Sequence, residues 1–279
     1  MSGITPTGIN SNAQHFFCNI MIGCIIQARM NSSRLPGKVM INVDKKHPLL
    51  YYVITQLQNS KFLDKIVVAT TTKKDDDEIY NYVTNTKIDC FRGSELDVLD
   101  RYYQCAKKFS LSTIVRIPAD KPLIDPHLMD KMITIFNSNS YDYVTNFLPL
   151  TFPSGTEVEI FSFESLETAW KNAKLPSERE HVTPHFYNNE KQFQIYNYEN
   201  SENLSNLRYA VDRVEDLELV RLLISRIKTR PILLEDIITQ FKIDPKLIEI
   251  NKNVNYYEGY EKSKKEDIEF LDSKRIKQK

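Results

Sequence analysis

Three cations lie within ten residues directly after an apolar run that is typical of a buried strand. Residues 22–26 form this run, and the loop that follows contains Arg29, Arg34 and Lys38. An arginine guanidinium presents planar pairs of N–H donors that match phosphate oxygens, and lysine adds a compact point charge. One loop cation would indicate only a solvated basic surface, whereas three after a single strand favour a phosphate-binding loop.

The residues between these cations allow the backbone to approach an anion closely. Ser32, Ser33 and Gly37 have small side chains, so backbone N–H groups can contact phosphate oxygens. The loop is not a Walker A motif, because Lys38 is followed by Val39 instead of Ser or Thr and the glycine spacing is absent. We therefore predict a phosphate site of another type.

Two aspartates follow predicted strands further along the chain. Asp120 comes after the apolar run 113–117, and Asp212 comes after the run 207–211. In open α/β sheets, ligands bind beyond the carboxyl ends of the strands. Asp120 is placed to hold Mg²⁺ through one carboxylate, together with substrate phosphates and water. The residues alone fit two roles for Asp212 equally, a second carboxylate for this metal or the N-cap of the next helix.

Strand-like and helix-like segments alternate through the first half of the chain. We predict strands at 22–26, 65–70, 87–91, 113–117 and 142–145, and helices at 49–59, 75–86, 96–109 and 126–137. Asp125 before Pro126 is typical of a helix N-cap with proline in the first turn. This βαβα rhythm with apolar strands predicts an α/β fold with a mostly parallel sheet covered on both faces.

The rhythm breaks between residues 147 and 206, where prolines and aromatic residues are scattered around one predicted helix near 163–173. We interpret this segment as a small antiparallel arm packed beside the main sheet. A further strand at 207–211 and helices at 214–228 and 233–241 are expected after it.

The predicted organisation has three parts. Residues 21–245 form the main domain, and residues 246–279, rich in Lys, Glu and Tyr, form a mobile or helical tail. Residues 1–20 contain no Lys or Arg and make a poor secretory signal, so we expect a disordered leader before Met21.

Composition excludes several classes of partner. Lys+Arg and Asp+Glu are both 37 in 279 residues, so no net charge draws the chain to nucleic acid or to a membrane surface. No apolar run reaches the length of a membrane span. The four cysteines, Cys18, Cys24, Cys90 and Cys105, lack C-x-x-C spacing and indicate reduced thiols in a cytoplasmic protein.

Six segments carry a more specific pattern: Gln27–Lys38, Lys65–Thr71, Phe91–Tyr103, Arg116–Pro126, Ser177–Pro184 and Tyr209–Asp216. Together they resemble the cytidylyltransferase family that activates acidic sugars, the CMP-Kdo and CMP-sialate synthetases. They are most similar to its SpsF-like branch, named for spore-coat polysaccharide synthesis. The resemblance covers about residues 21–228. It implies a Rossmann-like, three-layer nucleotidyltransferase fold of the kind shared with GT-A glycosyltransferases.

The resemblance also implies roles for individual residues. It places the nucleotide on Ala28, Arg29, Ser33, Arg34, Lys38, Arg92, Gly93, Ser94, Asp97 and Asp120. It implies catalytic roles for Arg29, Lys38 and Asp120, and Mg²⁺ as a cofactor held by Asp120 and Asp212. Lys121, Arg179 and His181 are expected to bind an anionic acceptor, and an ion-paired dimer contact fits the last two equally well.

These patterns predict a CTP-dependent cytidylyltransferase. It would join CMP to an acidic sugar or a related phospho-compound and release pyrophosphate, in surface polysaccharide or glycoconjugate biosynthesis. We expect a homodimer with no nucleic-acid or membrane partner. The alternative is a GT-A-type glycosyltransferase that uses a sugar nucleotide, but the chain lacks an Asp-x-Asp pair after strand 113–117. A non-catalytic scaffold would not need the loop cations.

Overall fold

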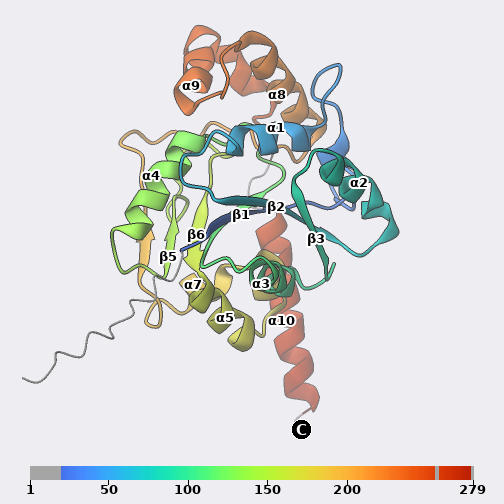
Figure 1. The fold of residues 1–279 in the computed structure, drawn as a ribbon, viewed down its shortest axis with the longest axis vertical. Coiled ribbons are helices and arrows are strands. Elements are labelled where there is room, and N and C mark those ends of the chain that lie inside the picture. The colour runs from blue at the N-terminus through green and yellow to red at the C-terminus, as the bar shows by residue number, and fades with distance from the viewer. Residues whose placement is uncertain (1–19, 255–257, 278–279) are drawn as a thin grey trace, which may run out of the picture.

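A single seven-stranded sheet, in the order β3-β2-β1-β4-β6-β5-β7, organises the chain (Figure 1). The computed structural model describes residues 20–254 and 258–277. The strands are β1 (Ile22–Gln27), β2 (Lys65–Thr71), β3 (Asp89–Gly93), β4 (Thr113–Pro118), β5 (Tyr143–Thr145), β6 (Glu159–Ser162) and β7 (Ile195–Asn197). Strands β3, β2, β1 and β4 pair in parallel, and β6 runs antiparallel to β4 and β5. The predicted mostly parallel α/β sheet is confirmed.

Helices cover both faces of the sheet, as Figure 1 shows. One face is covered by α1 (Leu49–Leu57), α2 (Asp77–Asn85) and α4 (Pro126–Asn137), and α8 (Val214–Arg226) and α9 (Leu234–Ile243) lie beyond α1 on the same side. The other is covered by α3 (Val98–Lys108), α5 (Phe163–Asn172), α6 (Pro176–His181) and α7 (Pro184–Asn188). Short 3₁₀ turns form η1 (Lys38–Met40), η2 (Lys74–Asp76) and η3 (Pro245–Ile250). The central strands are therefore buried on both sides, which explains their continuous apolar sequences.

Local sequence signals fix where several helices begin. Asp125 caps α4, because its Oδ1 accepts hydrogen bonds from the backbone N–H groups of His127 at 2.7 Å and Leu128 at 3.1 Å. Pro126 occupies the first turn, as predicted. Asp97 caps α3 in the same way through the N–H of Asp100. Both caps lie at the carboxyl edge of the sheet, and they set the direction of the helices that leave it.

The prediction of a sheet strand at 207–211 is wrong. The segment is extended and buried, but its one ladder contact is a parallel bridge between Ser154 and Arg208. Its backbone bonds to loops instead: the N–H of Tyr209 donates to the Ser154 carbonyl and that of Val211 to the Asp120 carbonyl. A short run of buried apolar residues occurs both in strands and in such buried extended segments, so the pattern could not separate the two.

The segment 147–206 supplies the antiparallel strand that was expected of it, inside the main sheet instead of beside it. Strand β6 lies between β4 and β5, and β7 extends the same sheet in parallel with β5. Strand β6 is only four residues long and includes the charged Glu159, which hid it in the sequence. Its insertion brings Glu159 opposite Arg116.

The tail is helical where it is described. Helix α10 (Glu258–Lys277) lies against α6, and Asp267 accepts hydrogen bonds from both the backbone N–H and the hydroxyl of Ser177. The expected leader lies outside the described residues except for Ile20, and so does Cys18. Cys24, Cys90 and Cys105 are free thiols, as predicted. No described helix is long and apolar enough to cross a membrane.

We predict that Asp267→Ala loosens α10. The change removes both acceptors of Ser177, and a lost buried hydrogen-bond partner costs about 1–3 kcal/mol. Hydrogen exchange of the amides in 258–277 should accelerate, with the core strands unchanged. Glu269→Ala is the control, because this residue is exposed on the same helix. Equal protection in both variants would show that the Ser177 contact does not hold the helix.

Candidate active site

The ammonium group of Lys38 joins two carboxylates that are far apart in sequence. Its Nζ donates to Asp120 Oδ2 at 3.0 Å, to Asp212 Oδ1 at 2.8 Å and to the Val211 carbonyl at 2.8 Å. Two carboxylates that bond one ammonium lie close enough to share a single cation. The sequence analysis expected this convergence at the sheet edge.

Loop geometry turns Lys38 inward. Gly37 adopts the left-handed backbone conformation with φ 69°, which a residue with a side chain rarely tolerates, and its N–H closes the loop on the Met30 carbonyl at 2.8 Å. Turn η1 then starts at Lys38, which is 9% exposed. Asp120 follows β4 directly, and β4 is the neighbour of β1 in the sheet. The Asp120 carboxylate and the Lys38 ammonium group therefore come from the ends of adjacent strands.

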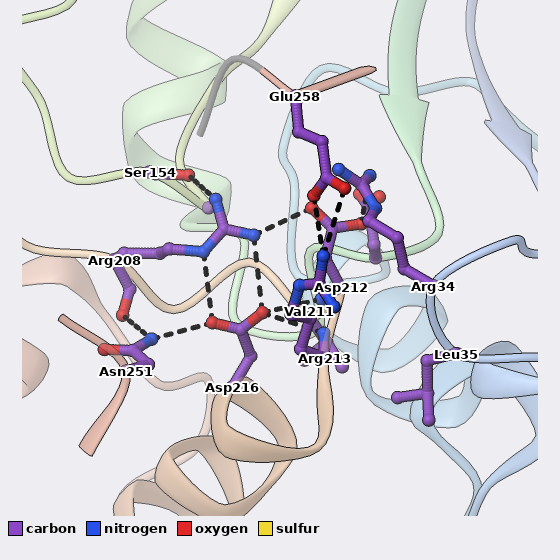
Figure 2. A network of polar contacts seen from close by, with 12 residues as sticks. Arg34, Leu35, Ser154, Arg208, Val211, Asp212, Arg213, Asp216, Asn251 and Glu258 are labelled. Carbon is purple, nitrogen blue, oxygen red and sulfur yellow. Dashed lines mark hydrogen bonds and ion pairs between the residues drawn. The ribbon is translucent and has the colours of Figure 1, made fainter. Parts of the chain in front are cut away.

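Asp212 is surrounded by cations (Figure 2). Its Oδ1 also accepts from Arg34 Nη2 at 2.7 Å, and its Oδ2 accepts from Arg208 Nη2 at 2.7 Å. Burial would raise the pKa of Asp212, but the charges of Lys38, Arg34 and Arg208 lower it to about 2. Burial likewise opposes the charge on Lys38, and the two carboxylates raise its pKa above the usual value. Asp212 and Lys38 are therefore both charged near neutral pH.

A third aspartate, Asp216, binds Arg208 and the backbone of Asp212 and so supports this arrangement. It is fully buried and accepts from Arg208 Nε at 3.0 Å, from Asn251 Nδ2 at 2.8 Å and from the N–H groups of Asp212 and Arg213. Asp216 therefore holds the backbone just before α8, whose N-cap is Arg213, and Asp212 is not the cap of that helix. The Asp212 side chain is left to face Asp120.

The carboxylates of Asp120 and Asp212 fit a magnesium site that is completed by the substrate. Mg²⁺ commonly binds through one or two carboxylates plus substrate phosphates and waters. The described residues contain no group of three or more His, Cys, Asp or Glu side chains that could hold a metal by themselves. Asp120 and Asp212 therefore suit a metal that arrives with a phosphate ligand.

A polar cavity of about 220 Å³ opens beside the two aspartates. Its lining residues are Arg116, Pro118, Asp120, Lys121, Phe147, Ser154, Glu157, Glu159, Arg208, Ala210 and Asp212. Lys121, expected to contact the acceptor, lies here and donates to the carbonyl of Glu157 at 2.8 Å, with its carboxylate at 3.1 Å. Arg116 is ion-paired with the buried Glu159. The lining thus carries both cationic donors and carboxylate acceptors.

The other predicted residues of the loop after β1 lie outside the cluster of Lys38 and Arg34. Ala28 is buried and its N–H donates to the Ala69 carbonyl at 3.2 Å, whereas Ser33 is exposed. Arg29 points toward α6, where its Nη2 lies 3.6 Å from Glu180 Oε1. Arg29 therefore does not join the cluster of Lys38 and Arg34 in this structure.

The expected nucleoside residues lie after β3. Arg92 at the end of this strand donates to the Thr71 carbonyl at 2.8 Å and to Asp77 Oδ1 at 2.6 Å. Gly93 ends β3, and the Ser94 hydroxyl accepts from the Asp97 N–H at 3.0 Å. These residues form a compact turn on the far side of β1 from the aspartate pair.

Arg179 and His181 of α6 lie apart from the cavity lining. Arg179 Nε donates to Asp97 Oδ2 at 2.9 Å, so the structure brings an expected acceptor residue to an expected nucleoside residue. His181 Nε2 lies 2.7 Å from the Ser263 hydroxyl of α10. Both side chains thus link elements within one copy of the chain.

Four charged groups of the site escaped sequence reasoning. Arg208 and Asp216 lie four residues to either side of Asp212, a spacing that could have suggested a supporting pair. Arg116 is a charge inside an otherwise apolar strand, and such a residue requires a buried partner. Glu159 is that partner, which only the antiparallel register reveals.

The parallel sheet, the cationic loop after β1 and the two converging carboxylates define the chain as a nucleotidyltransferase. The sequence pattern of the family described as cytidylyltransferase matches residues 23–267, and the chain belongs to this family.

Individual relatives agree with this assignment. The chain is 38% identical over 232 residues to an uncharacterized protein of Methanocaldococcus jannaschii, covering 82% of this chain and 94% of that protein. It is 31% identical over 214 residues to the spore coat polysaccharide biosynthesis protein SpsF of Bacillus subtilis, covering 74% and 88%. The expected SpsF-like resemblance is confirmed.

Solved structures give the same result. A cytidylyltransferase from Leptospira borgpetersenii superposes with a TM-score of 0.80 at 33% identity, covering 85% of this chain and 99% of that one. The CMP:2-keto-3-deoxy-manno-octonic acid synthetase complexed with CTP superposes at 0.57 with 15% identity, covering 74% and 99%, which shows a shared fold.

We predict that Asp216→Asn destabilises the protein. The amide presents a donor to groups that are themselves donors, and breaking a buried ion pair costs about 3–5 kcal/mol. Urea unfolding measures this loss. The control is Glu249→Gln, which removes an exposed pair with Lys252 and should cost about 0–1 kcal/mol. Similar midpoints for Asp216→Asn and the wild type would contradict the supporting role.

Proposed function

We propose that the protein transfers a cytidylyl group from CTP to an oxygen of a small sugar-like acceptor and releases pyrophosphate. The observation that supports this most directly is the Lys38 contact with both Asp120 and Asp212, at the rim of a polar cavity. The cytidylyltransferase family and the SpsF relative support CTP as donor and a role in polysaccharide synthesis.

In this mechanism the acceptor oxygen attacks the α-phosphorus in line, and pyrophosphate leaves on the opposite side. Arg29, Arg34 and Lys38 bind the triphosphate and neutralise the charge that develops on the leaving group. The protein mainly positions the reactants, which converts a bimolecular reaction into an effectively unimolecular one. Lys38 and Arg34 must exchange their carboxylate partners for phosphate oxygens when CTP binds.

Mg²⁺ belongs to this proposal as the cofactor. Asp120 and Asp212 would hold it, and when bound it supplies electrostatic stabilisation of the phosphate oxygens. The carboxylates would then keep a cationic partner after Lys38 turns to the nucleotide.

The acceptor is proposed to be an acidic sugar or a related phospho-compound that occupies the cavity. Lys121 and Arg116 offer donors to its anionic group, and Glu157 and Glu159 offer acceptors to its hydroxyls. Expected nucleoside contacts on Arg92, Gly93, Ser94 and Asp97 remain part of the proposal, as do acceptor contacts from Arg179 and His181. We further propose a cytoplasmic homodimer, which light scattering after size exclusion would test.

The deciding experiment measures pyrophosphate release with each of the four nucleoside triphosphates against a panel of acidic sugars, sugar phosphates and phosphonates. We expect release with CTP and one acceptor class, and a CMP conjugate by mass spectrometry. A glycosyltransferase would instead consume a sugar nucleotide without releasing pyrophosphate. That outcome would overturn the proposal and favour the alternative.

We predict that Arg34→Ala and Lys38→Ala weaken CTP binding without unfolding the protein. Loss of a charge-assisted contact costs about 1.5–3 kcal/mol, or roughly 10- to 150-fold in affinity. Calorimetric titration with CTP and Mg²⁺ measures the effect. Lys45→Ala removes an exposed lysine nearby and is the matched control. Unchanged affinity in both variants would refute the phosphate-binding loop.

We predict non-additive losses for the aspartate pair. Asp120→Asn and Asp212→Asn should each greatly reduce kcat with the acceptor found above, because each removes one of two shared ligands. The double variant should be little worse than either single variant, since residues that act as a unit are non-additive. Excess Mg²⁺ should partly rescue the single variants only. Multiplicative losses without rescue would indicate that the two residues act independently.

A further inference from the structure

Arg101 on helix α3 is fully buried and largely unpaired. Its Nη1 donates to the Ser94 carbonyl at 2.6 Å. Its Nε and Nη2 have no hydrogen-bond partner, and no carboxylate in the described part of the chain forms an ion pair with it. Buried donors without a partner lose their hydration and gain nothing in return. Such a group in a nucleotidyltransferase indicates a ligand.

The two unpaired nitrogens form one edge of the guanidinium. Nε–H and Nη2–H point the same way and together bond two neighbouring acceptors. The same chain uses this edge elsewhere: Arg208 directs Nε and Nη2 to the two oxygens of Asp216, at 3.0 and 3.4 Å. Arg101 therefore presents an edge suited to a ligand with two adjacent acceptor atoms.

Arg101 lies at the carboxyl end of β3. A Cβ added to Gly93 would lie 3.0 Å from Arg101 Cγ and 2.8 Å from the Phe91 ring, so glycine there makes room for the arginine. Burial lowers the pKa of Arg101, and the charge of Arg29 lowers it further. Its guanidinium thus lies near the ends of both β1 and β3. The Lys38 contacts with Asp120 and Asp212 lie at the same edge of the sheet, near the end of β4.

We propose that Nε and Nη2 of Arg101 donate to O2 and N3 of the cytosine ring of bound CTP. This inference rests on the proposed function and adds how the base is selected. Cytosine presents two adjacent acceptors, O2 and N3, whereas uracil presents an N–H donor at position 3. A buried edge suits a flat neutral ring better than a hydrated phosphate, because the ring loses less hydration on burial. Because the edge is fully buried, this contact requires that the residues covering it open when CTP binds.

The test is calorimetric titration of the wild type and Arg101→Lys with CTP and with UTP, each with Mg²⁺. Lysine keeps the charge but lacks the two-donor edge. A matched two-donor contact discriminates bases by roughly 5- to 150-fold, so we expect the wild type to prefer CTP by such a factor. Arg101→Lys should lose most of this preference through weaker CTP binding. Arg226→Lys, which alters an exposed pair with Asp244, is the control and should keep it.

A second measurement uses only the wild-type protein, so it does not depend on how the variant folds. A CTP analogue with C–H in place of N3 should bind about as weakly as UTP. Affinity equal to that of CTP would overturn the proposal. A folded Arg101→Lys variant that keeps its CTP preference would also overturn it. The proposal would also be overturned if Arg101→Lys weakened the binding of CTP and UTP equally but left the binding of CMP unchanged. The edge would then contact the phosphates that CMP lacks. A wild type that binds neither triphosphate would refute the proposed function itself.

Discussion

The site depends on compensation between two carboxylates, buried Asp212 and half-buried Asp120, and the cations that face them. Asp120 and Asp212 would repel one another at this separation without a shared positive charge. Lys38 supplies it, and Arg34 and Arg208 complete the balance on Asp212. In the proposed function, phosphates would take over the cations while a metal would take over the carboxylates. Charge balance would then be preserved in the free and the bound states.

The fold places these groups through short connections at one edge of the sheet. Strands β1 and β4 are neighbours, so the loop with Lys38 and the turn with Asp120 meet without a long connection. Asp212 arrives from the far end of the chain on an extended segment fixed to Ser154 and Asp120 by backbone hydrogen bonds. Asp216 then sets the start of α8 and the position of Arg208 together. The turn after β3 and the polar cavity beside Asp120 therefore lie on opposite sides of β1.

Sequence reasoning predicted the groups whose signals are local. The cap at Asp125 and the parallel strands followed from turn chemistry and from the apolar runs. The convergence of Asp120 and Asp212 followed from the rule for strand ends together with the family resemblance, because the residues alone left Asp212 open as a helix cap. Prediction from the sequence failed where the contact that determines the structure joins residues far apart in the chain. Strand β6 is short and charged, and only pairing with β4 makes Glu159 the partner of Arg116. Arg101 gave no signal, because a basic residue on an amphipathic helix is normally solvated and its burial follows from the glycine at position 93.

A crystal structure with CTP and Mn²⁺ as an anomalous substitute for Mg²⁺ would test the central claim most directly. The account predicts one anomalous peak shared by the carboxylates of Asp120 and Asp212 and a phosphate of the nucleotide. It also predicts that Lys38 Nζ has left the carboxylates for phosphate oxygens. A metal bound elsewhere, with Lys38 still between the two aspartates, would contradict it.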